Sequence, residues 1–343
     1  MKINLLLTFD HELPLGNLRG SYEDALFKPT YKLLELAKKV EVPITLFTDI
    51  LSAVQFKGWD YEGFYKPYKE QLQKALASGH EVQLHVHPHW LTTTFEHGNY
   101  FPSSDFGLSC FRNHALYSIE NIIGAACKNL LDICREAVPD YNITAYRAGG
   151  YNIEPASSDI FRALFRNGIM YDSSIPLGYY YASAISEIDF RTLPQTANWH
   201  ISENGNFRKA AHEGILEIPI ATKPKSFFEI PTRFRLKKYA FRAPISHGNM
   251  IHEGRDPSFG QKLKMFLSPR LLSFDNHTQD AEYLMSILDY NVKKFRNQEE
   301  ISLAACSHPK TMGSYALQMM EEFVEKASKK YPELRFVKFN DLK

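Results

Sequence analysis

The fold of this chain is indicated by its first apolar stretch, Asn4-Leu5-Leu6-Leu7-Thr8-Phe9, which Asp10-His11-Glu12 follows directly. A short apolar run that ends in ionisable residues is typical of a buried strand in a parallel sheet. Similar runs recur along the chain, separated by helical patterns with one apolar side. Strands that alternate with amphipathic helices predict an α/β protein with a parallel sheet.

The number of these repeats predicts that the sheet forms a barrel. Further strands are expected at 43–48, 81–85, 144–147, 169–171, 215–220, 301–305 and 335–339, and helices at 31–40, 68–77, 116–136, 157–166, 279–295 and 316–327. The polar, aromatic or Pro/Gly-rich stretches 49–67, 90–113, 175–213 and 222–278 are interpreted as loops. No linker divides the chain, so we expect a single domain over residues 1–343.

Composition and charge narrow the class of protein. The 343 residues are 44% hydrophobic and 23% charged, as in ordinary globular proteins, and the net charge of +1 argues against nonspecific nucleic-acid binding. The apolar run 3–9 is shorter than the core of a signal peptide, and no stretch approaches the roughly 18 apolar residues of a membrane span. The four cysteines lack a Cys-x-x-Cys spacing, and we expect a cytoplasmic protein.

Three histidines at alternate positions, in His85-Val86-His87-Pro88-His89, predict a metal site. On an extended strand, His85 and His89 would lie about 13 Å apart, at about 3.3 Å per residue, which is too far to share one ion. We therefore expect a bend, favoured by Pro88, that brings His89 back toward His85 and leaves His87 outside or behind the ligands. The alternative is a polar turn that happens to contain histidines.

Ionisable or glycine-rich segments follow five of the expected strands. They are Asp10-His11-Glu12, the histidine cluster, Arg147-Ala148-Gly149-Gly150-Tyr151, Asp172-Ser173-Ser174 and Ser307-His308-Pro309. In parallel α/β barrels the carboxyl ends of the strands meet on one face, which carries the catalytic groups. Together these segments predict one active site.

In this order the segments resemble the polysaccharide deacetylase family, which are metal-dependent carbohydrate esterases built on a distorted (β/α) barrel. The matching motifs are Thr8-Phe9-Asp10, Gly79-His80-Glu81 with His85 and His89, Arg147–Gly150, Asp172 and His308. The resemblance is greatest to the branch associated with surface polysaccharide and lipopolysaccharide biosynthesis. It implies a distorted barrel of about seven strands with long loop insertions.

The first motif departs from the family pattern, because His11 replaces the usual second aspartate and Glu12 follows it. Either residue could complete the metal site. If strand alternation continues past Asp10, Asp10 and Glu12 face one side and His11 faces the other. This alternation favours Glu12, although three histidines would also suit zinc.

The resemblance implies metal-dependent hydrolysis of an N-acetyl group on a saccharide or a lipid-linked glycan, with release of acetate. His85, His89 and Glu12 would hold a divalent ion, expected to be Zn²⁺. Asp10 would accept the proton of the attacking water, and His308 would protonate the departing amine.

Two further residues are assigned supporting roles by the same resemblance. Arg147 would keep Asp10 ionised, and Asp172 would orient a catalytic partner. The plain alternatives are a surface ion pair for Arg147 and a turn or helix-capping role for Asp172. Trp90, Tyr151 and Tyr171 lie beside the motifs and could stack on sugar rings or simply pack in the core.

The segment Lys223–Arg242 is basic and rich in aromatic residues. It predicts contact with an anionic glycolipid, a lipid-linked sugar phosphate or a peripheral membrane surface, and the alternative is a solvated loop. Two other functions remain open beside a sugar deacetylase. One is an amidohydrolase of a small non-sugar amide, and the other is a silent glycan-binding protein on the same scaffold.

Overall fold

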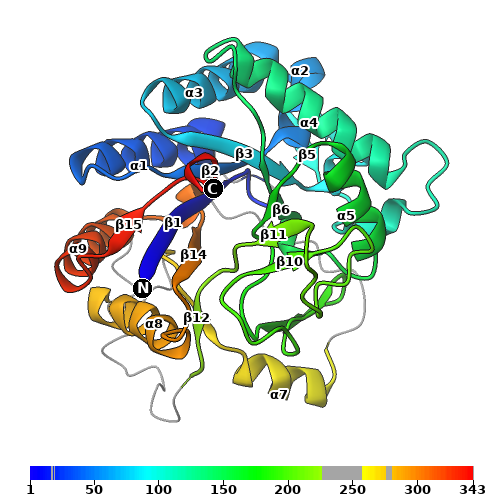
Figure 1. Ribbon diagram of the computed structural model, residues 1–343. Coiled ribbons are helices and arrows are strands. Elements are labelled where there is room, and N and C mark those ends of the chain that lie inside the picture. The colour runs from blue at the N-terminus through cyan, green and yellow to red at the C-terminus, as the bar shows by residue number, and fades with distance from the viewer. Residues whose placement is uncertain (17, 19, 226–256, 276–279, 343) are drawn as a thin grey trace.

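The computed structural model describes all residues except 17, 19, 226–256, 276–279 and 343 (Figure 1). Its centre is a nine-stranded sheet in the order β10-β11-β7-β6-β3-β2-β1-β14, with β15 paired to β1. The strands are β1 (Lys2–His11), β2 (Thr45–Asp49), β3 (Glu81–Val86), β6 (Ala145–Ala148), β7 (Tyr171–Asp172), β10 (Trp199–Ile201), β11 (Ile215–Glu217), β14 (Glu300–Ser307) and β15 (Leu334–Phe336).

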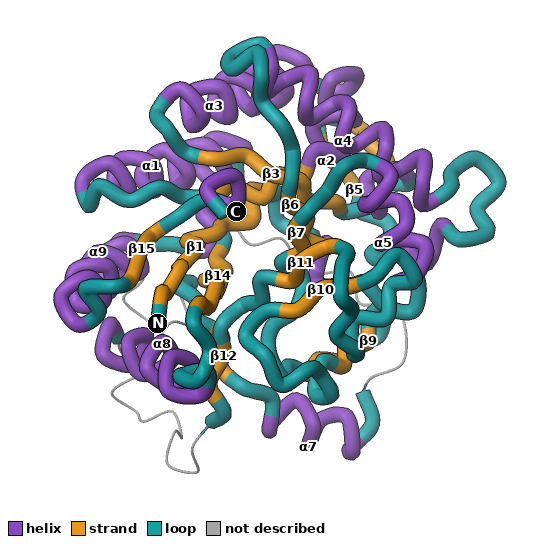
Figure 2. Tube along the Cα trace, in the orientation of Figure 1, coloured by secondary structure: helices purple, strands orange, loops and turns teal. Residues whose placement is uncertain are grey.

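This sheet curls until its two sides approach each other (Figure 2). All its pairings are parallel except that of β10 with β11. The chain just after β11 then reaches β14, where Ala221 N donates to Ala304 O at 2.9 Å and Ala304 N donates to Pro219 O at 3.0 Å. The expected distorted (β/α) barrel is therefore confirmed.

Helices lie around the outside of the curled sheet, as the purple segments in Figure 2 show. They are α1 (Lys28–Lys39), α2 (Ile50–Trp59), α3 (Lys66–Ala77), α4 (Ile119–Arg135), α5 (Ser157–Arg166), α7 (Phe259–Leu267), α8 (Ala281–Lys294) and α9 (Ser314–Lys330). Short hairpins are formed by β4 (Thr94–Glu96) with β5 (Asn99–Phe101) and by β8 (Tyr180–Ala182) with β9 (Glu187–Asp189), and β12 (Thr222–Lys223) pairs with β13 (Arg270–Leu271). Within the described residues, no helix is both long and apolar enough to cross a membrane.

The side chains of β1 alternate between the core that packs against the helices and the inside of the barrel. Leu5, Leu7 and Phe9 belong to the large hydrophobic cluster that also contains residues of the surrounding helices. Leu6 belongs to a smaller cluster inside the barrel, together with Phe47 and other strand residues. Because side chains alternate along a strand, Asp10 and Glu12 continue the inner row of Leu6.

The parallel register brings the expected segments to one end of the barrel. Asp10 is paired with Phe47 of β2, and Asp49 at the end of that strand is paired with His85. His85 is paired in turn with Arg147 of β6. The carboxyl ends of these strands therefore meet on one face, as the motif order predicts.

The expected loops contain more regular structure than their composition indicates. Region 49–67 includes α2, which is buried at Ile50, Leu51, Ala53 and Phe56. A helix that is apolar on most sides lacks the one-sided periodicity by which helices are recognised, and α2 lies between other helices and the histidine segment. Region 222–278 likewise includes α7 and β13.

Candidate metal centre and its surroundings

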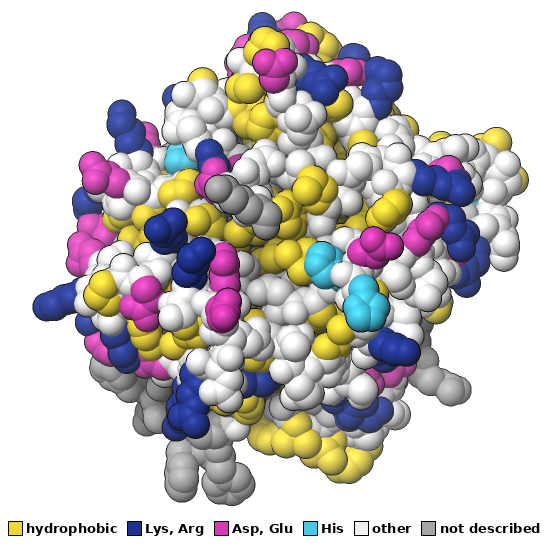
Figure 3. All heavy atoms as spheres, in the orientation of Figure 1, with side chains coloured by type: hydrophobic (Ala, Val, Ile, Leu, Met, Phe, Trp, Pro, Cys, Tyr) yellow, Lys and Arg dark blue, Asp and Glu magenta, His cyan; other side chains and the backbone are white. Residues whose placement is uncertain are grey.

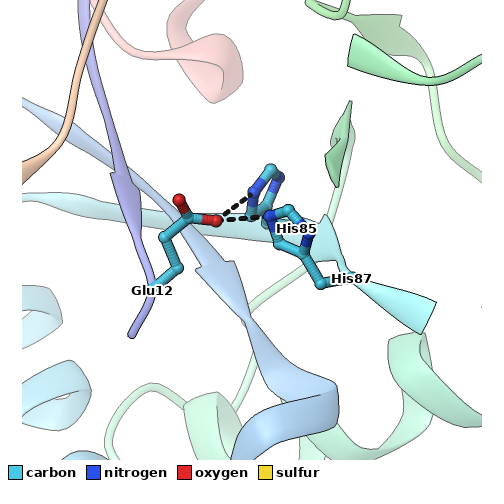
Figure 4. A group of neighbouring side chains, drawn as sticks. All are labelled: Glu12, His85 and His87. Carbon is cyan, nitrogen blue, oxygen red and sulfur yellow. Dashed lines mark hydrogen bonds and ion pairs between the residues drawn. The ribbon is translucent and has the colours of Figure 1, made fainter. Parts of the chain in front are cut away.

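Three side chains converge at the carboxyl end of the barrel in a geometry that suits a metal ion (Figure 4). Glu12, His85 and His87 each offer one ligand atom, and these atoms lie within 4.8 Å of one another. The Nε2 atom of His85 is 3.1 Å from Oε2 of Glu12, and Nε2 of His87 contacts the same oxygen. All three side chains are buried.

The structure brings His87, and not His89 as predicted, next to Glu12 and His85. The chain stays extended through His87 and turns only afterwards, in the short 3₁₀ helix Pro88–Leu91 with Pro88 at its start. Residues two apart on an extended chain face the same side, so His85 and His87 point together, with ring centroids 4.7 Å apart. The turn carries the ring of His89 away to pack against Trp90 and Phe106.

The histidine hydrogen bonds fit metal binding. Nδ1 of His85 lies 2.8 Å from the backbone oxygen of Arg147 and donates its proton there, which leaves Nε2 with a lone pair toward Glu12. The Nε2 atom of His87 is buried and makes no regular hydrogen bond, although it touches the Glu12 carboxylate. Two imidazoles and one carboxylate form a common ligand set for a catalytic divalent ion such as zinc.

The choice between His11 and Glu12 follows from strand alternation. His11 faces away from the ligand group, with Nε2 2.8 Å from Oε1 of Gln71 and its ring against Tyr68. Glu12 faces the group, and its second oxygen accepts a 2.6 Å bond from the buried ammonium of Lys310. Burial alone would raise the pKa of Glu12, but Lys310 and the histidines hold that pKa well below its ordinary value. The sequence did not predict a role for Lys310, because no residue near it in the sequence points to Glu12.

Asp10 is held by a guanidinium, as expected from the resemblance. Nη1 of Arg147 donates to Oδ1 of Asp10 at 2.7 Å, and the other nitrogens of the guanidinium donate to Thr8 and Ser173. Arg147 is fully buried, with its guanidinium carbon 4.2 Å from the ring centroid of Phe47. Burial favours the neutral acid, but Arg147, His85 and His308 outweigh it, so the pKa of Asp10 is lowered and the group is a carboxylate.

His308 reaches the same place from β14 and is held by Asp275. Its backbone N–H donates to Oδ1 of Asp275 at 2.9 Å, and its Nδ1 lies 3.2 Å from Oδ2. Its Nε2 is 3.6 Å from both Asp10 and Glu12. Burial lowers the pKa of His308, but Asp275 and then the other carboxylates more than compensate and raise it to about 9. The sequence did not predict a role for Asp275, which lies in the region 222–278 that was interpreted as a loop.

Trp90 has a structural role instead of the predicted contact with substrate. It is 1% exposed, and its indole N–H donates to Oδ2 of Asp49 at 2.6 Å. The other oxygen of Asp49 accepts a 3.3 Å bond from the backbone N–H of His87. Asp49 therefore fixes the start of the turn that places His87, a role that no local sequence pattern predicts.

Asp172 and Tyr171 lie away from the ligand group. Asp172 is paired in register with Tyr146, one residue before Arg147, so its side chain lies on the other face of the sheet from Arg147. It accepts from Ser174 at 2.7 Å and touches none of the predicted catalytic residues. Tyr171 packs inside the barrel on Phe339 and donates to Leu342 O at 3.1 Å. The structure thus gives neither residue the predicted place.

Tyr151 is placed at a cavity beside the ligand group. The cavity has a volume of about 200 Å³ and is lined by His87, Phe106, Tyr151, Tyr179 and Tyr181, among other residues. The hydroxyl of Tyr151 lies 3.3 Å from Sγ of Cys306. Burial raises the pKa of that thiol, so Cys306 is not an activated nucleophile.

Of the basic segment Lys223–Arg242, residues 226–242 lie outside the described residues.

The structure is similar to several solved structures at low sequence identity. No family model and no curated protein matches the chain. The structure is similar to a polysaccharide deacetylase from Mycobacterium smegmatis, at 10% identity and a TM-score of 0.47, over 99% of this chain and 88% of the other. It is similar to an allantoinase at 11% identity and a TM-score of 0.49, with the same coverage. It is also similar to a probable polysaccharide deacetylase from Pseudomonas aeruginosa PAO1 at 11% identity and a TM-score of 0.47, over 99% and 89%.

Proposed function

We propose that this protein is a metal-dependent hydrolase that removes an N-acetyl group from a saccharide and releases acetate. One observation carries the proposal. Beside a buried Glu12, His85 and His87 ligand group lie a carboxylate that is ionised and an imidazole whose pKa is raised to about 9. These are the protonation states that amide hydrolysis requires of a base and an acid at neutral pH.

Each residue of the site has its own role in the proposed reaction. When bound, a divalent ion supplies Lewis acidity at the acyl oxygen. Asp10 accepts a proton from the water that attacks the acyl carbon, and Arg147 keeps this carboxylate charged and oriented. As the C–N bond breaks, His308 gives the proton on its Nε2 to the departing nitrogen, which would otherwise leave as an unstable anion. Asp275 holds the imidazole for that transfer.

The aromatic cavity beside His87 favours a saccharide over a small amide. Tyr151, Tyr179 and Tyr181 line it, and tyrosine combines an apolar ring face with a hydroxyl that can meet sugar hydroxyls. Asn152, Ser183 and Ser186 add polar groups to the same wall. A cavity with a few polar groups among aromatic rings is typical of small-molecule sites.

The test is acetate release by the full chain reconstituted with Zn²⁺. The substrates are N-acetylglucosamine oligomers of increasing length and, for comparison, small N-acetyl amines without a sugar. Release from the saccharides alone, lost in His87→Ala, supports the proposal. Hydrolysis of the small amides alone would favour the amidohydrolase, and saccharide binding without turnover would favour a glycan-binding protein.

We also propose that the substrate is borne on an anionic membrane, and α7 is the described element that supports this. Its side chains Phe259, Leu263, Phe266 and Leu267 are 84%, 50%, 73% and 67% exposed and lie on one helical face. The apolar patch at the lower edge of Figure 3 lies where Figure 1 places α7. Lys262 and Lys264 belong to the same helix, and basic amphipathic helices bind anionic lipid surfaces.

Vesicle binding tests this second proposal. Phe259→Ser combined with Phe266→Ser should weaken binding to vesicles containing phosphatidylglycerol. The matched control is Phe165→Ser, which removes a 52% exposed phenylalanine from α5. Equal binding by both variants and the wild type would remove α7 from the membrane contact.

A further inference from the structure

A second cavity, of about 300 Å³, lies on the side of the site that holds His308. Asp275, which is hydrogen-bonded to His308, forms part of the wall of this second cavity. The second cavity shares Tyr179 and Tyr181 with the cavity beside His87. In the proposed reaction His308 protonates the departing amine. A group that fills this second cavity would therefore belong to the amine-bearing part of the substrate, not to the acetyl group.

Arg270 is the unusual residue of this cavity. It begins β13, where it is paired with Lys223 of β12. Its Nε is buried without a hydrogen-bond partner, and its guanidinium makes no ion pair with any residue that the structure describes. The fully buried Arg147 differs, because its guanidinium pairs with the carboxylate of Asp10. A buried donor without a partner is costly, and a bound acceptor removes that cost.

The lining of the cavity favours a negatively charged acceptor. Lys225 adds a second cation to the wall, with its ammonium 2.9 Å from the backbone oxygen of Phe266. The one carboxylate among the described lining residues is Asp275, whose oxygens already accept from His308 and Thr311. Ser268 and Ser273 contribute neutral hydroxyls. Among the described lining residues, the guanidinium of Arg270 is therefore the group that lacks a partner and can meet an anion.

We propose that this cavity is a subsite for an oxyanion, a carboxylate or a phosphate, attached to the amine-bearing part of the substrate, and that Arg270 recognises it. The Nε and one terminal nitrogen of a guanidinium form a fork that fits two oxygens of such a group. The position of the subsite on the leaving-group side rests on the proposed function, but the binding of the anion does not.

Binding is measured first, by calorimetry on the full chain with inorganic phosphate and, separately, with methylphosphonate and propionate as probes. Arg270→Gln should weaken the binding of at least one probe by about tenfold or more, because it removes a charge-assisted bidentate contact. The matched control is Arg335→Gln, which removes an exposed arginine from β15 on the outer part of the sheet and should leave binding unchanged. Unchanged binding in Arg270→Gln, or equal loss in Arg335→Gln, would overturn the subsite.

Kinetics then place the subsite and distinguish the two anions. The substrates are N-acetylglucosamine, its 6-phosphate and N-acetylmuramic acid, which carries a carboxylate. Arg270→Gln should raise the KM for one charged sugar by about tenfold while kcat and the neutral sugar change little. Arg270→Lys, which keeps the charge but lacks the fork, should be intermediate. An equal effect on all three sugars contradicts a specific anion subsite, and absence of turnover with Arg270-dependent phosphate binding refutes the proposed function alone.

Discussion

Buried carboxyl side chains lie on opposite faces of the same sheet, and their pKa values are shifted in opposite directions. Asp10, on the inner face, is 3% exposed and is bound by the guanidinium of Arg147. Asp172 and Glu217 are in register on β7 and β11, are fully buried, and form no ion pair with any described lysine or arginine. Burial raises the pKa of both, and the neighbouring Asp172 raises that of Glu217 further.

The comparison shows that burial alone does not decide whether a carboxyl group can act as a base. Burial disfavours the charged form of all three groups. Only Asp10 has a cation close enough to reverse that effect, so its pKa is lowered. The inner face is thus suited to proton transfer, whereas on the outer face the two carboxyl groups interact and Glu217 holds its proton more tightly than usual.

The largest expected difference between the two faces is in catalysis. Asp10→Asn should reduce kcat/KM by about 10² to 10⁴, because the amide cannot accept the proton of the attacking water. Glu217→Gln replaces a carboxyl group of raised pKa, on the face away from the metal centre, by an amide of the same shape, and should change kcat/KM less than about twofold. Acetate release from an N-acetylated saccharide measures both. Comparable losses in the two variants would mean that the outer pair takes part in the reaction.

A similar contrast exists between neighbouring histidines. His87→Ala should lower metal affinity by at least about 100-fold, since it removes a ligand atom next to Glu12. His89→Ala should retain the metal, because its ring packs against Trp90 and Phe106. Elemental analysis after dialysis against a weak chelator measures occupancy, and circular dichroism checks that both variants fold. Metal loss only in His89→Ala would restore the ligand set predicted from the sequence.

These cases show what the sequence could predict. Strand alternation was sufficient to choose Glu12 over His11, because β1 stays extended through His11. It was not sufficient for the histidine cluster, because the choice of ligand depends on whether the chain bends before or after His87. That bend is fixed by Asp49, which is 38 residues earlier in the chain. Local patterns do not contain such contacts.

The same limit explains the residues that were missed or misplaced. Asp275 and His308 are 33 residues apart, and Lys310 and Glu12 are 298 apart, so neither pair forms a local motif. Asp172 follows a strand as a catalytic residue would, but the register turns its side chain to the outer face. The barrel itself was predictable, because most of its strands and helices carry their own local pattern, although α2 does not.

The next largest expected effect is on the pH dependence of kcat/KM, through His308, the proposed general acid. Because His308 has a raised pKa of about 9, it should be protonated at neutral pH, and kcat/KM should fall as the pH rises through about 9. Asp275→Asn removes the largest charge that raises this pKa, so the alkaline limb should move to lower pH by about one unit. Asp289→Asn is the control, because this half-buried carboxylate of α8 pairs with Lys330 and not with His308. An alkaline limb that stays in place would separate Asp275 from the titrating group.

The smallest expected effect is on stability, and its sign distinguishes the two faces. Glu217 has a folded-state pKa above its ordinary value of 4.5, so its protonated form stabilises the fold at low pH. That contribution is lost as the pH rises above 4.5 toward the raised pKa. Asp10 has a pKa below its ordinary value of 3.8, so its contribution is present above 3.8 and is lost as the pH falls.

Urea unfolding measured from pH 4 to pH 8 can test this difference. The wild-type free energy of unfolding should contain a component that declines with rising pH, and Glu217→Gln should remove it, because the amide does not titrate. Asp10→Asn should leave that decline intact. A decline that persists unchanged in Glu217→Gln would mean that the outer carboxyl is not held neutral, and the contrast between the two faces would then lose its electrostatic basis.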